Sequence, residues 1–139
     1  FITDNLGLDS NLRAMRKFAQ ADLLIAQRKF DSAFLVLDSL VSLFPFHSLA
    51  DDILLRRAQA FEEQGKWLEA IQEYQKILEH HPQSIYADDA LFNLAIIHDK
   101  RLLNPEKAAA YYFQLMKEFR GSVFVTEARK RYRELQKVS

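Results

Sequence analysis

The chain has 139 residues, of which 49% are hydrophobic and only three each are Gly and Pro, so a disordered chain is excluded and helices with short connections are expected. Lys plus Arg and Asp plus Glu number 19 each, so the charge gives no support for a nucleic-acid partner. No Cys is present, which excludes disulfides, and no apolar run approaches the roughly 18 residues that span a bilayer, so we expect no direct membrane insertion.

The first nine residues are expected to be the tail of a preceding element. Residue 1 is Phe rather than Met, and no basic-then-apolar signal segment follows. We therefore expect the chain to be a processed product or a piece of a longer protein.

Seven helices follow from the helical spacing of the apolar residues. Gly65 suits a turn between two helices because Gly adopts a positive φ at little cost, and Pro45 and Pro82 suit helix ends. Three serines are expected to cap the next helix: Ser48, Ser84 and Ser122. The expected helices span residues 10–28, 31–44, 49–64, 67–80, 85–100, 105–119 and 122–137.

The helices repeat in pairs. An Ala recurs every 37 residues in the first helix of each pair and every 37 or 38 residues in the second. Small residues at such positions allow two helices to approach closely. The alanines are Ala21, Ala58 and Ala95 in the first helices and Ala33, Ala70 and Ala108 in the second.

The repeat defines one domain over residues 1–139. Its units are residues 14–45, 51–82 and 88–120, followed by a capping helix over 122–137. The last helix has no partner within the repeat, so we expect it to cover the open apolar end of the third unit. The covering residues are expected to be Val123, Ala128, Tyr132 and Leu135.

The middle unit resembles the tetratricopeptide repeat in an Ala, an aromatic residue and a terminal Pro in paired helices. The matching residues are Ala58, Phe61, Gly65, Trp67, Ala70, Tyr74 and Pro82. The resemblance implies an all-α, right-handed superhelical stack of three antiparallel helix pairs, a TPR-like α-solenoid, with a C-terminal capping helix. The third unit departs most, with Leu103 for Gly, Pro105 for the aromatic residue and Arg120 for Pro.

The period here is about three residues longer than the usual tetratricopeptide period. This longer junction is similar to repeats of bacterial cell-envelope proteins of the outer-membrane assembly lipoprotein and Tol-system accessory types. The second resemblance implies a periplasmic or cell-envelope location, with a cytoplasmic one as the alternative.

A second stripe follows one face of the first helices. The family resemblance implies that this face lines a concave groove that binds a protein or peptide partner. Phe18, Leu55 and Phe92 form an apolar ladder, which we expect to be anchors flanked by acids for an amphipathic or basic segment. The expected groove comprises Met15, Phe18, Asp22, Asp52, Leu55, Gln59, Glu62, Asp89, Phe92, Ile96 and Asp99, with Ile25 on the same face.

An alternative interpretation of this stripe is ordinary packing. First-turn acids such as Asp52 and Asp89 also favour the helix dipole without any partner. The residues alone leave both interpretations open.

No residue pattern indicates a metal, a cofactor or catalysis. His80 and His81 are adjacent on one helix and cannot face one site together, and His98 stands where Leu24 and Phe61 stand in the other units, so we expect it to be packed. No Gly-rich phosphate loop or Cys nucleophile is present. The basic segment at residues 127–137 is expected to be a solvated face, with nucleic acid or anionic lipid as the weaker alternative.

The sequence therefore predicts a non-enzymatic protein–protein interaction module, a fragment of a larger bacterial envelope-associated protein. The alternative is a structural piece that packs within its parent chain or a homo-oligomer, with weak self-association.

The close approach at Ala58 is testable. Ala58→Leu is expected to overpack the helix–helix contact and to lower the free energy of unfolding by about 1–3 kcal/mol. Gln59→Leu, one residue away on the other face, serves as the control and is expected to change it little. Equal losses in denaturant melts would contradict the two-face interpretation.

Overall fold

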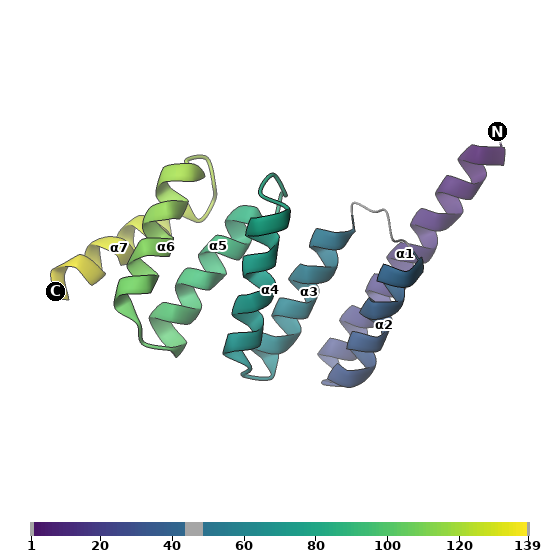
Figure 1. Ribbon diagram of the computed structural model, residues 1–139, viewed down its shortest axis with the longest axis horizontal. Coiled ribbons are helices and arrows are strands. Elements are labelled where there is room, and N and C mark those ends of the chain that lie inside the picture. Colours follow the sequence, from purple (N-terminus) through teal and green to yellow (C-terminus); the bar gives the residue numbers. More distant parts are fainter. Residues whose placement is uncertain (1, 44–48, 139) are drawn as a thin grey trace.

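The computed structural model describes the backbone of residues 2–43 and 49–138, with side chains over 11–43 and 49–137. These ranges contain seven α-helices and a short π-helical segment, without strands. The helices form an extended stack with the termini at opposite ends (Figure 1). They are α1 (Ile2–Ala26), α2 (Phe30–Leu43), α3 (Ala50–Glu63), α4 (Trp67–His80), α5 (Ala87–Ile96), η1 (Ile97–Arg101), α6 (Pro105–Glu118) and α7 (Val125–Val138).

The stack is an all-α solenoid of helix pairs, as the sequence predicts. Within each unit the two helices pack together, α1 with α2, α3 with α4 and α5 with α6, and α7 packs on α6. Each unit also contacts the next, through α2 with α3 and through α4 with α5. All of these contacts join elements that are close in sequence.

The recurring alanines lie where the helices meet. All six are fully buried, so each leaves room for the large residues around it. Tyr74 and Tyr112 fill the equivalent space in the second and third units and are also fully buried. Trp67, at the start of α4, packs against the core cluster that contains Ala70, and its ring carries the Arg101 guanidinium 4.8 Å from the centroid.

The turn between the two helices has the same backbone form in every unit. Gly65 has φ of +73°, and the equivalent Arg28 and Leu103 have φ of +61° and +51°. The left-handed conformation therefore recurs although only the middle unit supplies the residue that adopts it without strain. In the third unit, which lacks this Gly, the start of α6 has favourable residues. Asn104 caps the helix by accepting from the Lys107 N–H, and Pro105 occupies the first turn.

Two expectations need correction. Helix α1 begins at Ile2, so residues 2–9 continue this helix rather than forming the tail of another element, because extending a helix costs less than starting one. Val123 is 87% exposed and covers nothing; Phe124 packs against the third core cluster in its place. Pro45, His47 and Ser48 lie outside the described residues.

Gly65 and Gly121 provide a matched pair for testing the turn. A Cβ at either position would meet nothing within 4 Å, and only Gly65 has a positive φ. Gly65→Ala is therefore expected to lower the free energy of unfolding by about 1 kcal/mol through backbone strain alone. Gly121→Ala should leave it unchanged or slightly raised. Denaturant melts that show equal losses would exclude strain as the cause.

Candidate partner-binding face

The residues of the expected groove lie on α1, α3, α5 and η1, the first helices of the three units, but they differ widely in exposure. Met15 (65% exposed), Asp22 and Gln59 face solvent. Asp52, Glu62, Asp89, Phe92 and Ile96 are half-buried, whereas Phe18, Leu55 and Asp99 are buried.

The apolar ladder is mostly packed rather than exposed. Phe18 (8% exposed) is covered by the Arg56 guanidinium, 4.4 Å from its ring, and Leu55 (7% exposed) belongs to the central core cluster. Phe92 is stacked on Phe124, which directly precedes α7, with 4.6 Å between the ring centroids. The expectation that these three residues are open anchors is therefore corrected: each packs against neighbouring side chains because a repeat unit buries its apolar surface against its neighbours.

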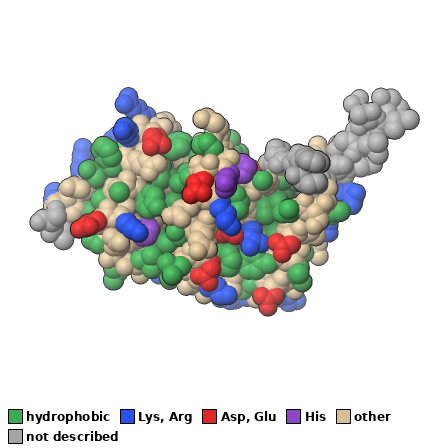
Figure 2. Space-filling model, viewed as in Figure 1, with side chains coloured by type: hydrophobic (Ala, Val, Ile, Leu, Met, Phe, Trp, Pro, Cys, Tyr) green, Lys and Arg blue, Asp and Glu red, His purple; other side chains and the backbone are tan. Residues whose placement is uncertain are grey.

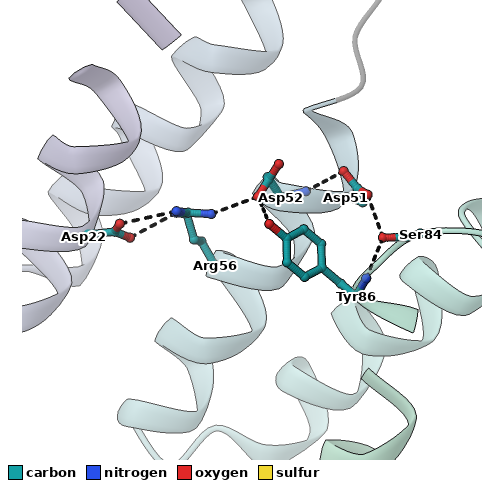
Figure 3. Close-up of polar contacts among 6 residues, drawn as sticks. All are labelled: Asp22, Asp51, Asp52, Arg56, Ser84 and Tyr86. Atoms are coloured by element: carbon teal, nitrogen blue, oxygen red, sulfur yellow. Dashed lines mark hydrogen bonds and ion pairs between the residues drawn. The ribbon is translucent and has the colours of Figure 1, made fainter. Parts of the chain in front are cut away.

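The acids beside the ladder form a polar chain that joins three units (Figure 3). Arg56 Nε donates to Asp22 Oδ1 across the first junction at 3.0 Å, and Arg56 Nη1 donates to Asp52 Oδ1 at 3.2 Å. The hydroxyl of Tyr86, the residue directly before α5 of the third unit, donates to the same Asp52 oxygen at 2.6 Å. This hydrogen bond, with burial, raises the pKa of Tyr86 to about 12.

A Ser–Asp hydrogen bond beside this chain fixes the junction. Ser84 Oγ donates to Asp51 Oδ2 of the preceding unit at 2.6 Å and accepts from the Tyr86 N–H at 3.0 Å. The next junction repeats it, with Ser122 Oγ donating to Asp88 Oδ2 at 2.7 Å. The N-cap assignment of these two serines is therefore wrong, because each lies three residues before its helix and joins two units instead.

Two other predicted groove acids accept hydrogen bonds within their own unit. Tyr74 Oη donates to Glu62, and Tyr112 Oη donates to Asp99 at 2.9 Å. Arg131 of α7 adds two hydrogen bonds to Asp99, at 2.8 and 2.7 Å. Burial alone would raise the pKa of Asp99, but the hydrogen bonds from Arg131 and Tyr112 outweigh it and hold this pKa below its usual value.

Glu62 and Asp89 lack such a cation. Burial raises the pKa of both carboxyls. At Glu62 the hydrogen bond from Tyr74 and the charge of Arg101 oppose this rise in pKa, whereas the charges of Glu63 and Asp89 add to it. Asp89 accepts only from the neutral side chain of Asn93, and Glu62 from the hydroxyl of Tyr74. Among the described residues neither carboxylate forms an ion pair, although the charge of Arg101 partly offsets that of Glu62. These two acids from neighbouring units therefore leave negative charge on this face.

His98 is packed, as expected, and is 5% exposed. Its ring lies over Tyr111 with 5.5 Å between centroids and 16° between the planes, on the π-helical segment η1. Burial and the charge of Lys107 lower the pKa of His98. The part of the chain that the structure describes contains no group of three or more His, Asp or Glu side chains that could hold a metal ion.

Basic and acidic side chains are mixed across the middle of the face shown in Figure 2. On α7, Arg131 pairs with Asp99 and Glu134, so one basic residue of this helix is structural rather than merely solvated. No helix over the described residues is long and apolar enough to cross a membrane.

The equivalent contacts at successive junctions and the shared turn identify the units as copies of one repeat. Residues 18–85 match the family model for the tetratricopeptide repeat. This match covers most of the first two units, and tetratricopeptide repeats generally mediate protein–protein interactions and are not catalytic. No curated protein matches the chain.

The sequence reasoning missed the junction bonds, although their signal was visible. Residues 82–89 read PQSIYADD, and the Asp pair has a counterpart at residues 51–52, while the Ser–x–aromatic sequence recurs at 122–124. Recurrence of both partners at the repeat spacing indicates a contact between units.

The buried imidazole predicts a pH dependence of stability. Because the pKa of His98 is lowered in the folded state, the unfolded chain binds this proton first as the pH falls through the ordinary His value of about 6.5. The contribution of His98 to stability is therefore present above that pH and is lost below it.

His98→Phe introduces the residue found at the equivalent position Phe61. This variant is expected to lack the part of the loss in unfolding free energy that His98 causes between about pH 7 and pH 5. His80→Gln, at an exposed position, is the control and should keep it. Urea melts across this range would contradict the assignment if both variants lost stability in parallel with the unaltered chain.

Proposed function

We propose that the chain is a non-enzymatic protein–protein interaction module that binds a partner segment along the face formed by α1, α3 and α5. The membership of residues 18–85 in the tetratricopeptide pattern supports interaction as the general function. The observation that supports this face is the pair Glu62 and Asp89, two half-buried carboxylates from neighbouring units that form no ion pair with a described residue.

Under this proposal, the partner segment carries basic side chains. A Lys or Arg placed between Glu62 and Asp89 would lower the pKa of both and regain the stability that their burial costs. Exposed Met15 and Gln59 and half-buried Ile96 offer further contacts along the same face. Asp22 and Asp52 contribute less charge, because both are already paired with Arg56.

A structural role within a parent chain or a homo-oligomer is the second candidate. Large apolar side chains are exposed on the second helices and connections, including Leu35 (70%), Leu68 (65%) and Ile85 (82%). Sedimentation of the isolated chain tests this role, because such surfaces would drive self-association at micromolar concentration.

The cell-envelope location is proposed on the long repeat period alone. Residues 51–82 and 88–120 are separated by the longer junction that is similar to envelope repeats. Detection of the full-length protein in cell fractions tests this proposal, and recovery in the cytoplasmic fraction alone would exclude it.

The charge of the face is tested with a peptide library displayed on phage. The unaltered chain is expected to select peptides with Lys or Arg, and Glu62→Gln with Asp89→Asn is expected to weaken their binding by about tenfold and to flatten its salt dependence. The matched control is Asp31→Asn with Glu69→Gln, which neutralises two exposed acids on the second helices.

Both double variants are expected to keep the helical circular dichroism, because Gln and Asn retain the hydrogen-bond acceptors. Selection of the same peptides by the Glu62→Gln, Asp89→Asn variant with unchanged affinity would exclude this face as the site.

A further inference from the structure

The first junction, where α1 and α2 of the first unit meet α3 and α4 of the second, lacks an acceptor that both later junctions use. At the second junction the Ser84 hydroxyl donates to Asp51 of the preceding unit. At the third junction the Ser122 hydroxyl donates to Asp88 in the same way. The residue at this repeat position in the first unit is Ala14, 37 residues before Asp51, and its methyl side chain cannot accept a hydrogen bond.

A second hydrogen bond of the later repeat is also ruled out at the first junction. Asp52 accepts from the Tyr86 hydroxyl across the second junction at 2.6 Å. The equivalent residue of the first unit is Met15, and Leu49 stands at the position of Tyr86. Because the Leu49 side chain has no polar atom, this bond cannot form. The two contacts that fix the second junction therefore have no counterpart at the first.

The first junction also has an arginine where the later junctions are apolar. Leu94 of α5 is fully buried in the central core cluster, and Tyr132 of α7 packs against the third cluster. Arg57 of α3 stands at the same repeat position. Its guanidinium lies 5.1 Å from the ring centroid of Phe34 and donates to Asp38 at 3.0 Å. Helices α2 and α3 also meet over fewer residues than α4 and α5 or α6 and α7 do. Apolar burial therefore contributes less to this junction.

Ion pairs with exposed acids cross the first junction instead. The pairs are Arg28 with Glu63, Arg56 with Asp22 and Arg57 with Asp38, at 3.8, 3.0 and 3.0 Å. The acid side chains in these pairs are 58%, 52% and 64% exposed, in the same order. Salt weakens such exposed pairs, because the Debye length falls to about 3 Å at about 1 M.

The later junctions do not depend on exposed ion pairs. Among the described residues no ion pair crosses the second junction. At the third junction Arg131 pairs with Asp99, whose side chain is only 4% exposed, and salt screens buried pairs much less. High salt is therefore expected to loosen the first junction and to leave the other two closed.

We propose that the first junction is a salt-sensitive hinge about which the first unit moves relative to the second and third units, which stay fixed to each other. Room for this movement exists, because a cavity of about 320 Å³ lies between α2, α3 and α4, with Val41, Ile53 and Leu54 in its lining. The movement changes the distance from Met15 on α1 to Glu62 on α3, and with it the shape of the face formed by the first helices. The hinge is a property of the fold and does not rest on the partner proposed for that face.

The movement is measured with spin labels on introduced cysteines, because the chain has no Cys of its own. The label sites are Leu35, Gln72 and Ala110, which are exposed and stand at equivalent positions of α2, α4 and α6. Leu35→Cys with Gln72→Cys spans the first junction, and Gln72→Cys with Ala110→Cys spans the second as the matched control. Double electron–electron resonance on the full chain gives both distance distributions at about 0.05 M and about 1 M NaCl.

The distribution across the first junction is expected to become about twice as wide at the higher salt, whereas the one across the second should not change. Asp22→Asn with Asp38→Asn removes the acids of two ion pairs and is expected to widen the first distribution already at low salt. The control is Asp31→Asn with Glu69→Gln, two exposed acids of α2 and α4 that form no ion pair with a described residue. All four positions are exposed, so circular dichroism is expected to show an intact fold for both variants.

Equal widening across the two junctions would overturn the proposal, because the stack would then loosen as a whole. A first distribution that does not change with salt would overturn it too. So would equal behaviour of the Asp22→Asn, Asp38→Asn variant and the Asp31→Asn, Glu69→Gln control, since the ion pairs would then not hold the junction closed.

Discussion

Each helix pair of this chain has more apolar surface than its own two helices can bury, and the excess must be covered by the next pair. Leu55 shows this constraint, because it lies on a first helix and belongs to a cluster that also contains Ala90, Leu94 and Ile97 of the next unit. The core is therefore continuous along the stack. The junctions between units, rather than any single unit, hold the fold together.

Polar contacts fix the geometry of these junctions. Asp51 and Asp88 receive a serine hydroxyl from the following unit, and Asp22 and Asp99 receive an arginine. Hydrogen bonds to charged groups contribute more than neutral ones, and their direction restricts how one unit can rotate on the next. Most of the acids that the sequence suggests for partner binding thus fix the register between units. Glu62 and Asp89 differ because neither forms an ion pair with a described residue.

Most of the fold could be predicted from the sequence, because the repeat multiplies every local signal. The alanines, Gly65 and the apolar spacing place six of the seven helices within three residues of their observed bounds, when η1 is counted as the end of α5. The start of α1 was missed, since no second copy of residues 2–9 exists with which to compare them. The positive φ of Arg28 and Leu103 follows from their alignment with Gly65 and not from their own preference.

The candidate site was predicted less well, for a physical reason. Periodicity shows which residues share a helix face but not whether a neighbouring unit covers that face. Phe18 and Leu55 share the stripe with Met15, yet only Met15 is exposed. Predicting pairs such as Arg56 with Asp22 requires knowledge of the distance between units, and the residue pattern of a single helix does not contain it.

The termini lie at opposite ends of the stack (Figure 1), and every helix contacts mainly its neighbours in sequence. A force applied between the two ends would therefore pass through the junctions in series, because over the described residues the main helix contacts join elements close in sequence. The weakest junction would yield first, and the units on either side would keep their own cores. Under tension the molecule would therefore lengthen in steps, as one junction after another separates, rather than unfold in a single transition.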